Sequence, residues 1–122
     1  MGLVDEDTGV VIARDVKVAD GFFGRFRGLM LKREFYEGEA LFFIFKRPGR
    51  NSVHTFFMKF PIDLIYLDSS YTVVEIRNFL KPWHLHRSRA VSSYLIELPA
   101  GTVSRFKVKL GHKISRGKSF NP

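Results

Sequence analysis

Residues 53–68 read VHTFFMKFPIDLIYLD and decide the fold class of this chain. Side chains of an extended strand alternate between two faces, so four side chains would share one face here. These are His54, Phe56, Met58 and Phe60. Because the other face is also largely apolar, residues 53–60 are predicted to form a central strand. Pro61 has no N–H to donate to a strand ladder and is predicted to bend the chain.

The hairpin that follows is the most regular element that the pattern predicts. Residues 62–67 and 72–76 are largely apolar, and the four residues Asp68–Tyr71 form the turn between them. Similar runs bounded by glycine, proline and polar residues predict further strands. They cover residues 10–18, 41–45 and 94–98, with a last short strand near Ile114.

Two other segments have different patterns. After Asp20, apolar residues recur at helical spacing, which predicts one short helix near residues 20–30. Residues 105–110 alternate basic and apolar side chains as a half-exposed strand would, and a short helical turn after Gly101 is the alternative. Many short strands and one small helix predict a single all-β domain over residues 1–122, built as a compact antiparallel sandwich or barrel.

Composition excludes several classes of protein. The chain has no cysteine, which rules out disulfides, thiolate metal sites and thiol catalysis. The longest unbroken apolar run, Ala40–Phe45, is far shorter than the roughly 20 residues that cross a bilayer. The first residues, MGLVDEDTG, carry acids where a secretory signal has a basic patch and an apolar stretch. We therefore expect a cytoplasmic protein without a membrane segment.

The formal net charge of +8 is concentrated toward the C-terminus. No acidic residue follows Glu97, whereas six lysines and arginines do. They are Arg105, Lys107, Lys109, Lys113, Arg116 and Lys118. A basic surface of this kind binds nucleic acid by displacing counterions from phosphates. The alternative interpretation is a solvated strand face with no dedicated partner.

Four ordered blocks of the sequence resemble a known family. They are Phe26–Met30 (FRGLM), the segment 53–68, Glu97–Gly101 (ELPAG) and Val108–Ile114. Together they resemble the domain of unknown function 192 (DUF192) family, and the resemblance extends from Ile12 to Ile114. It implies a compact, mainly β domain of jelly-roll-like architecture, and it implies no reaction. His112 departs from the pattern, because the family usually has an aspartate after the glycine at that point.

Two acids are candidates for a buried site. Asp63 follows the bend at Pro61, and Glu97 is flanked by apolar residues. Buried acids are usually paired, and Arg27 and Lys59 are matching cations, so one interpretation is a structural network of these four charged residues. The other interpretation is a pocket that binds a small polar or anionic ligand.

The histidines also have two interpretations. His84 and His86 are two residues apart and would point the same way on a strand, as a pair of metal ligands must, with His54 or Asp63 as the third ligand. The chain lacks a second ligand cluster, so we expect no metal and no cofactor. We expect His54 to be a packed core residue, and the alternative is an acid–base pair with Asp63.

Trp83 lies among Lys81, His84 and Arg87. This interleaving of aromatic and basic groups is typical of proteins that bind single-stranded nucleic acid. A loop that covers the end of a sandwich would have the same content. The sequence contains no phosphate-binding loop, dinucleotide fingerprint or serine hydrolase motif.

These observations support three hypotheses about function. The first is a non-enzymatic module that binds a small ligand or a protein partner through Arg27, His54, Lys59, Asp63, Trp83 and Glu97. The second is a nucleic-acid-binding protein that uses Arg105, Lys107, Lys109, Lys113 and Arg116. The third is a hydrolase-like enzyme that uses His54 and Asp63. We expect a monomer that has no membrane partner.

Overall fold

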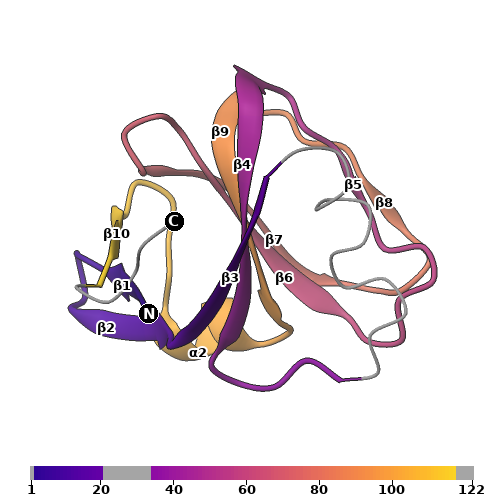
Figure 1. Cartoon of the computed structure of the whole chain (residues 1–122), viewed down its shortest axis with the longest axis horizontal. Helices are drawn as coiled ribbons and strands as arrows, with labels where there is room; N and C mark the ends of the chain where they lie inside the picture. The colour runs from indigo at the N-terminus through magenta and orange to yellow at the C-terminus, as the bar shows by residue number, and fades with distance from the viewer. Residues whose placement is uncertain (1, 21–33, 118–122) are drawn as a thin grey trace.

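The computed structural model of the chain describes residues 2–20 and 34–117 (Figure 1). Its strands are β1 (Leu3–Asp5), β2 (Val10–Ala13), β3 (Asp15–Asp20), β4 (Glu39–Gly49), β5 (Val53–His54), β6 (Ile62–Leu67), β7 (Val73–Leu80), β8 (Leu85–His86), β9 (Ser92–Pro99) and β10 (Ile114–Arg116). A short helix, α2 (Thr102–Phe106), follows β9. In the described ranges, no helix is long and apolar enough to cross a membrane.

The strands form one large sheet and two small ones. The large sheet has the order β3-β4-β9-β6-β7, and all of its pairs are antiparallel except β3 with β4. A three-stranded sheet, β10-β1-β2, and the two-stranded pair of β5 and β8 complete the described strands. Figure 1 shows the three-stranded sheet on one side of the large sheet and the β5–β8 pair on the other.

The central strands of the large sheet are buried on both faces, and their side chains divide between two hydrophobic clusters. Phe42 and Ile96 belong to the cluster that also contains Leu3 of the three-stranded sheet. Their neighbours Phe43 and Leu95 belong to the other cluster, which includes Val53 and Met58. Strands that are buried on both faces have continuous apolar sequences rather than alternating ones. This burial explains the runs LFFIF and IDLIYL.

The mainly β fold and the hairpin of residues 62–67 and 72–76 are confirmed, the hairpin as β6 and β7. The strands predicted at 41–45, at 94–98 and near Ile114 are also present. The helix predicted near residues 20–30 lies outside the described residues, except for Asp20, which ends β3. The jelly-roll-like arrangement of the strands stays a prediction.

Three strand predictions were wrong. Residues 10–18 are two strands, because the chain turns at Arg14, whose backbone N–H donates to Gly38. Only Val53–His54 of the predicted strand 53–60 is extended, because the Met58 N–H closes a turn onto the Thr55 carbonyl. Residues 105–110 are not a strand, and the helical alternative after Gly101 is confirmed as α2.

Candidate functional site

Three aromatic side chains lie together on the surface, next to the short strands β5 and β8. Phe56, Phe57 and Trp83 are 40%, 50% and 60% exposed. The ring centroids of Phe57 and Trp83 are 4.8 Å apart, and those of Phe56 and Trp83 are 6.2 Å apart. The His54 ring stacks on the Phe56 ring, with a centroid distance of 4.7 Å. We call Phe56, Phe57 and Trp83 the aromatic platform.

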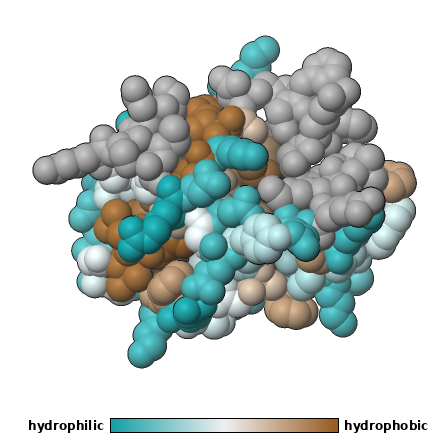
Figure 2. Space-filling view, turned by 60° about the horizontal axis from the view of Figure 1, so that its bottom comes forward, coloured by the Kyte–Doolittle hydropathy of each residue, from teal (hydrophilic) through white to brown (hydrophobic). Residues whose placement is uncertain are grey.

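A single exposed apolar residue is ordinary on a soluble protein. Figure 2 shows hydrophobic residues between hydrophilic ones over one face of the molecule. The aromatic platform differs because the Trp83 ring lies against both phenylalanine rings, and the three rings come from two loops that are far apart in the sequence. An exposed, contiguous apolar surface of this kind marks a binding site more often than a scattered residue does.

Thr55 joins the two loops that carry the platform. It is fully buried, and its backbone N–H donates to the His84 carbonyl at 2.8 Å. Its carbonyl accepts the backbone N–H of Trp83 at 2.9 Å. Its hydroxyl oxygen donates to the Lys81 carbonyl at 2.5 Å and accepts the backbone N–H of His84 at 3.0 Å. The rings that follow Thr55 are therefore held in register with Trp83.

Two residues of the platform have left-handed backbone conformations. The φ angle is 66° at Phe57 and 64° at Trp83. For a bulky side chain this conformation is uncommon and costs about 1–3 kcal/mol at each position. Such strain persists only where the surrounding contacts enforce it, as the hydrogen bonds of Thr55 do here. Strained residues of this kind cluster at ligand-binding sites.

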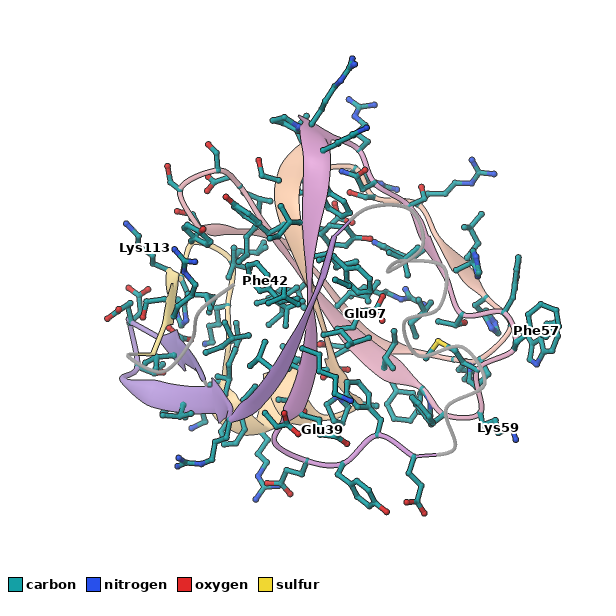
Figure 3. All side chains as sticks on the ribbon, viewed as in Figure 1. Glu39, Phe42, Phe57, Lys59, Glu97 and Lys113 are labelled. Atoms are coloured by element: carbon teal, nitrogen blue, oxygen red, sulfur yellow. The ribbon has the colours of Figure 1, made fainter. Side chains whose placement is uncertain are left out.

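The surroundings of the platform are basic. Residues 53–62 and 79–87, which contain the two loops, include no aspartate or glutamate. Lys59 and Lys81 are exposed in these loops, and so is Arg87. Figure 3 shows Phe57 and Lys59 at the same edge of the molecule. A ligand on the platform would therefore meet cations and no opposing carboxylate from either loop.

Asp63 has a structural role in the described structure. Its side chain is 1% exposed. One carboxylate oxygen accepts the backbone N–H of Phe79 at 2.9 Å, and the other accepts those of Gly101 at 3.0 Å and Val103 at 2.9 Å. The carboxylate thereby ties the end of β7 to the start of α2. The predicted pairing of Asp63 with Lys59 is not formed.

Lys59 and Glu97, two other members of the predicted site, lie apart (Figure 3). Lys59 is exposed, whereas Glu97 is 7% exposed within β9, between Leu41 of β4 and Leu64 of β6. Figure 3 shows Glu97 near the centre of the molecule and Lys59 at its edge. Arg27 lies outside the described residues. Of the predicted site residues that the structure describes, His54, Lys59 and Trp83 are part of the surface around the platform.

The predicted histidine chemistry has no geometric support. His54 is exposed, and its Nδ1 atom accepts the backbone N–H of Phe56 at 3.3 Å. The structure shows no contact between His54 and Asp63, and both oxygens of Asp63 already accept hydrogen bonds. Nδ1 of His84 is hydrogen-bonded to the Pro82 carbonyl at 2.8 Å, and Nε2 of His86 lies 2.6 Å from the Glu75 carboxylate. The group of potential metal ligands found among the described residues contains neither histidine.

Glu75 organises the loop that precedes β9. Its carboxylate accepts the backbone N–H groups of Arg89 and Ala90, both at 2.8 Å, and lies 2.6 Å from Nε2 of His86. Burial alone would raise the pKa of Glu75. The hydrogen bonds from the Ala90 N–H, the His86 ring and the Arg89 N–H outweigh burial and hold this pKa below its usual value.

Two of the basic residues near the C-terminus, Arg105 and Lys113, lie beside acids in the folded protein. Arg105 forms an ion pair with Glu37. The backbone N–H of Lys113 donates to the Asp7 carboxylate at 2.8 Å, and the Lys113 carbonyl accepts the backbone N–H of Glu6. The remaining basic candidates are Lys107, which ends α2, Lys109, which is exposed, and Arg116, whose guanidinium lies over the Tyr71 ring. Figure 3 places Lys113 at the edge opposite Phe57.

A cluster near these basic residues joins the two ends of the described chain. Ligand atoms of Asp5, Asp7 and His112 lie within 4.8 Å of one another. Nδ1 of His112 is 2.7 Å from the Asp5 carboxylate, which also accepts the backbone N–H of Asp7 at 3.0 Å. These contacts connect the turn after β1 to the turn before β10. These hydrogen bonds explain why the three side chains lie close together.

Of the three platform residues, the sequence indicated Trp83 as a binding residue but not Phe56 or Phe57. Phe56 and Phe57 follow His54 in an apolar run, and such a run predicts burial rather than exposure. The available signal was the sequence His-Thr-Phe-Phe itself, because a buried threonine between exposed rings can hydrogen-bond to a second loop. Nothing in the sequence indicates which loop that is.

The chain matches the family model DUF192, described as "Uncharacterized ACR", over residues 3–116. It is 39% identical over 114 residues to a UPF0127 protein of Thermococcus sibiricus, with 92% of this chain and 72% of that protein covered. It is also 39% identical over 114 residues to a UPF0127 protein of Pyrococcus horikoshii, with 92% of this chain and 96% of that protein covered.

Two solved structures have a similar fold. One, from Sinorhizobium meliloti, is provisionally called a transcription regulator; it has a TM-score of 0.83 and 25% identity, with 93% of this chain and 89% of that chain covered. The other, from Novosphingobium aromaticivorans, is described as a protein of unknown function; it has a TM-score of 0.85 and 20% identity, with 95% of this chain and 84% of that chain covered. The extent of the family match and the level of identity show that this chain belongs to the DUF192 family.

Proposed function

We propose that this protein is a non-enzymatic binding module that takes a planar, ring-bearing ligand by stacking on the aromatic platform. The observation that carries the proposal is the fixed arrangement of exposed rings, with Phe57 and Trp83 only 4.8 Å apart on left-handed backbone. Aromatic rings interact with one another in offset or tilted arrangements, so a rigid pair of rings offers a surface for a third planar group.

The fold alone does not require this arrangement. Half-exposed rings contribute little to the stability of the fold. The left-handed backbone at Phe57 and Trp83 destabilises the folded protein by about 1–3 kcal/mol at each position. The Thr55 hydrogen bonds nevertheless hold both rings in place. A surface that is fixed before the ligand arrives loses less conformational entropy on binding, which favours affinity.

The other hypotheses have weaker support. The acid–base pair of His54 and Asp63 lacks a contact, and Asp63 is buried under three backbone N–H donors. Among the C-terminal basic residues, Arg105 is paired with Glu37, and the backbone of Lys113 contacts Asp7. The name of the Sinorhizobium meliloti protein suggests regulation of transcription for that protein, and a non-enzymatic role for this chain is compatible with it.

Trp83 is the only tryptophan in the chain and belongs to the platform, so its fluorescence reports on binding directly. The experiment titrates the protein with the four ribonucleoside 5′-monophosphates at millimolar concentrations, as stackable probes. We expect saturable quenching of Trp83 by at least one of them. Absence of saturable quenching by all four would overturn the proposal.

A pair of variants locates the binding. Phe57→Gly removes one ring, and glycine adopts φ near 66° without strain, so the variant should stay folded and lose saturable quenching. Leu110→Ala is the matched control, because Leu110 is 64% exposed and lies in the turn between α2 and β10. It should bind as the wild type does. Equal binding by Phe57→Gly and the wild type would show that the ligand does not contact the platform.

A further inference from the structure

We infer that the natural ligand of the aromatic platform is single-stranded nucleic acid, whose unpaired bases stack on the rings while its phosphates contact Lys59 and Lys81. This inference rests on the proposed function and names its ligand class. Base stacking on aromatic side chains combined with a basic path for the backbone is the general mode of single-strand recognition. Both components are present in the two loops that Thr55 joins.

The rings form a row rather than an isolated contact. His54 stacks on Phe56, Phe56 contacts Trp83, and Trp83 contacts Phe57, with successive centroid distances of 4.7, 6.2 and 4.8 Å. A row of rings presents a face to more than one base. Bases in a duplex are covered by their neighbours, so only unpaired bases can stack on such a row.

The charges favour a polyanion. Lys59 comes two residues after Phe57, Lys81 comes two residues before Trp83, and both lysines are exposed. Residues 53–62 and 79–87 include no acid that would repel phosphates. Each phosphate that a lysine neutralises releases its counterions into solution, which favours binding. The affinity therefore falls as the salt concentration rises. A neutral planar ligand would make no use of these two cations.

An anionic membrane is the competing partner, because tryptophan and lysine are also common at membrane interfaces. The rings of the platform favour nucleic acid. His54 is stacked on Phe56, so a polar imidazole ring borders the apolar ones. Polar rings accept stacked bases readily but oppose burial in hydrocarbon. Vesicle binding is therefore an outcome of the test that would count against the inference.

The test measures the fluorescence anisotropy of a labelled 15-nucleotide oligouridylate as protein is added, over a series of salt concentrations. Two phosphate contacts predict a slope of about −1.4 for the logarithm of the association constant against that of the salt concentration. Lys81→Gln should reduce the slope to about −0.7. Lys109→Gln, the control on the C-terminal segment, should leave it unchanged. Phe57→Gly should weaken binding by about 5- to 150-fold.

Three results would overturn the inference. These are equal affinity for a 15-base-pair duplex, a slope that responds to Lys109→Gln instead of Lys81→Gln, and tighter binding to vesicles with anionic headgroups than to the oligonucleotide. If mononucleotides quench Trp83 but the oligonucleotide binds no tighter than they do, the inference fails and the stacking function stands. If neither the mononucleotides nor the oligonucleotide quench Trp83 in the wild type, the inference and the stacking function both fail.

Discussion

The backbone N–H of Trp83 donates a hydrogen bond of 2.9 Å to the carbonyl oxygen of Thr55. Thr55 directly precedes the two phenylalanines of the platform, so this bond sets the position of one aromatic loop against the other. The threonine side chain strengthens the junction through Lys81 and His84. The platform is consequently a tertiary feature that depends on one buried residue.

Replacement of Thr55 tests this dependence. Thr55→Val keeps the shape of the side chain and removes the hydroxyl, which leaves the Lys81 carbonyl and the His84 N–H without their partner. We expect the free energy of unfolding in urea to fall by about 1–3 kcal/mol. Thr55→Ser keeps the hydroxyl and should retain most of the stability. Equal stability of the valine and wild-type proteins would show that the hydroxyl does not hold the loops.

Asp63 should behave as a structural residue. Asp63→Asn replaces one acceptor oxygen with an N–H₂ group and removes the charge that three backbone N–H groups contact. We expect the free energy of unfolding to fall by at least about 2 kcal/mol, because hydrogen bonds to charged groups contribute about 1.5–3 kcal/mol each. The measurement is chemical denaturation followed by circular dichroism.

Lys59→Met serves as the comparison for Asp63. Lys59 is exposed, and a surface substitution usually changes stability by no more than about 0.5 kcal/mol. A large loss of stability in Lys59→Met together with a small loss in Asp63→Asn would favour an ion pair of the two residues, as the sequence predicted. The hydrogen bonds of Asp63 predict the reverse order.

Lys107 offers a stabilising substitution. It ends α2 with φ at 56°, and this conformation favours glycine. Lys107→Gly should raise the free energy of unfolding by up to about 1 kcal/mol, since it removes backbone strain at an exposed position. Lys109→Gly, two residues further along, has no left-handed backbone to relieve and should be neutral or destabilising. The melting temperatures of the two variants should therefore move in different directions.

The lowered pKa of Glu75 makes the free energy of unfolding depend on pH in the acid range. Its pKa in the folded protein lies below its ordinary value of 4.5, so it contributes stability that is fully present above that value. This contribution is lost as the pH falls from about 4.5 through the lower pKa of the folded state. We expect Glu75→Gln to be less stable than the wild type at pH 7, with a difference that shrinks below pH 4.5. A difference that grows on acidification would contradict the hydrogen-bonding scheme.

The sequence predicted the parts of the fold that depend on local pattern. The apolar runs of β4, β6 and β9 identify the central strands because both faces of the sheet are buried. The same rule failed for residues 55–60, where a similar apolar pattern belongs to a turn that leaves Phe56 and Phe57 exposed. Left-handed backbone at Phe57 opposes the local preference of a bulky residue, so only contacts with the distant residues Lys81 and His84 can produce it.

The candidate site was also predicted only where a local pattern indicates it. Trp83 among basic residues pointed to single-stranded nucleic acid, and this local signal leads to the platform. The role of Asp63 could not be predicted, because its partners are backbone N–H groups of Phe79, Gly101 and Val103, and the identity of a side chain carries no information about backbone donors. Matching acids to cations by charge therefore paired Asp63 with Lys59, whereas the described partners of Asp63 are backbone N–H groups.

The most direct test of the central claim is a nuclear magnetic resonance titration of the ¹⁵N-labelled protein with the 15-nucleotide oligouridylate. Trp83 contributes the only indole N–H signal, so the platform has an unambiguous probe. We predict that the largest shifts occur at this indole and at the backbone amides of Phe56, Phe57 and Lys81. Shifts confined to residues 105–116, with the Trp83 indole unmoved, would contradict the account and assign binding to the C-terminal basic residues.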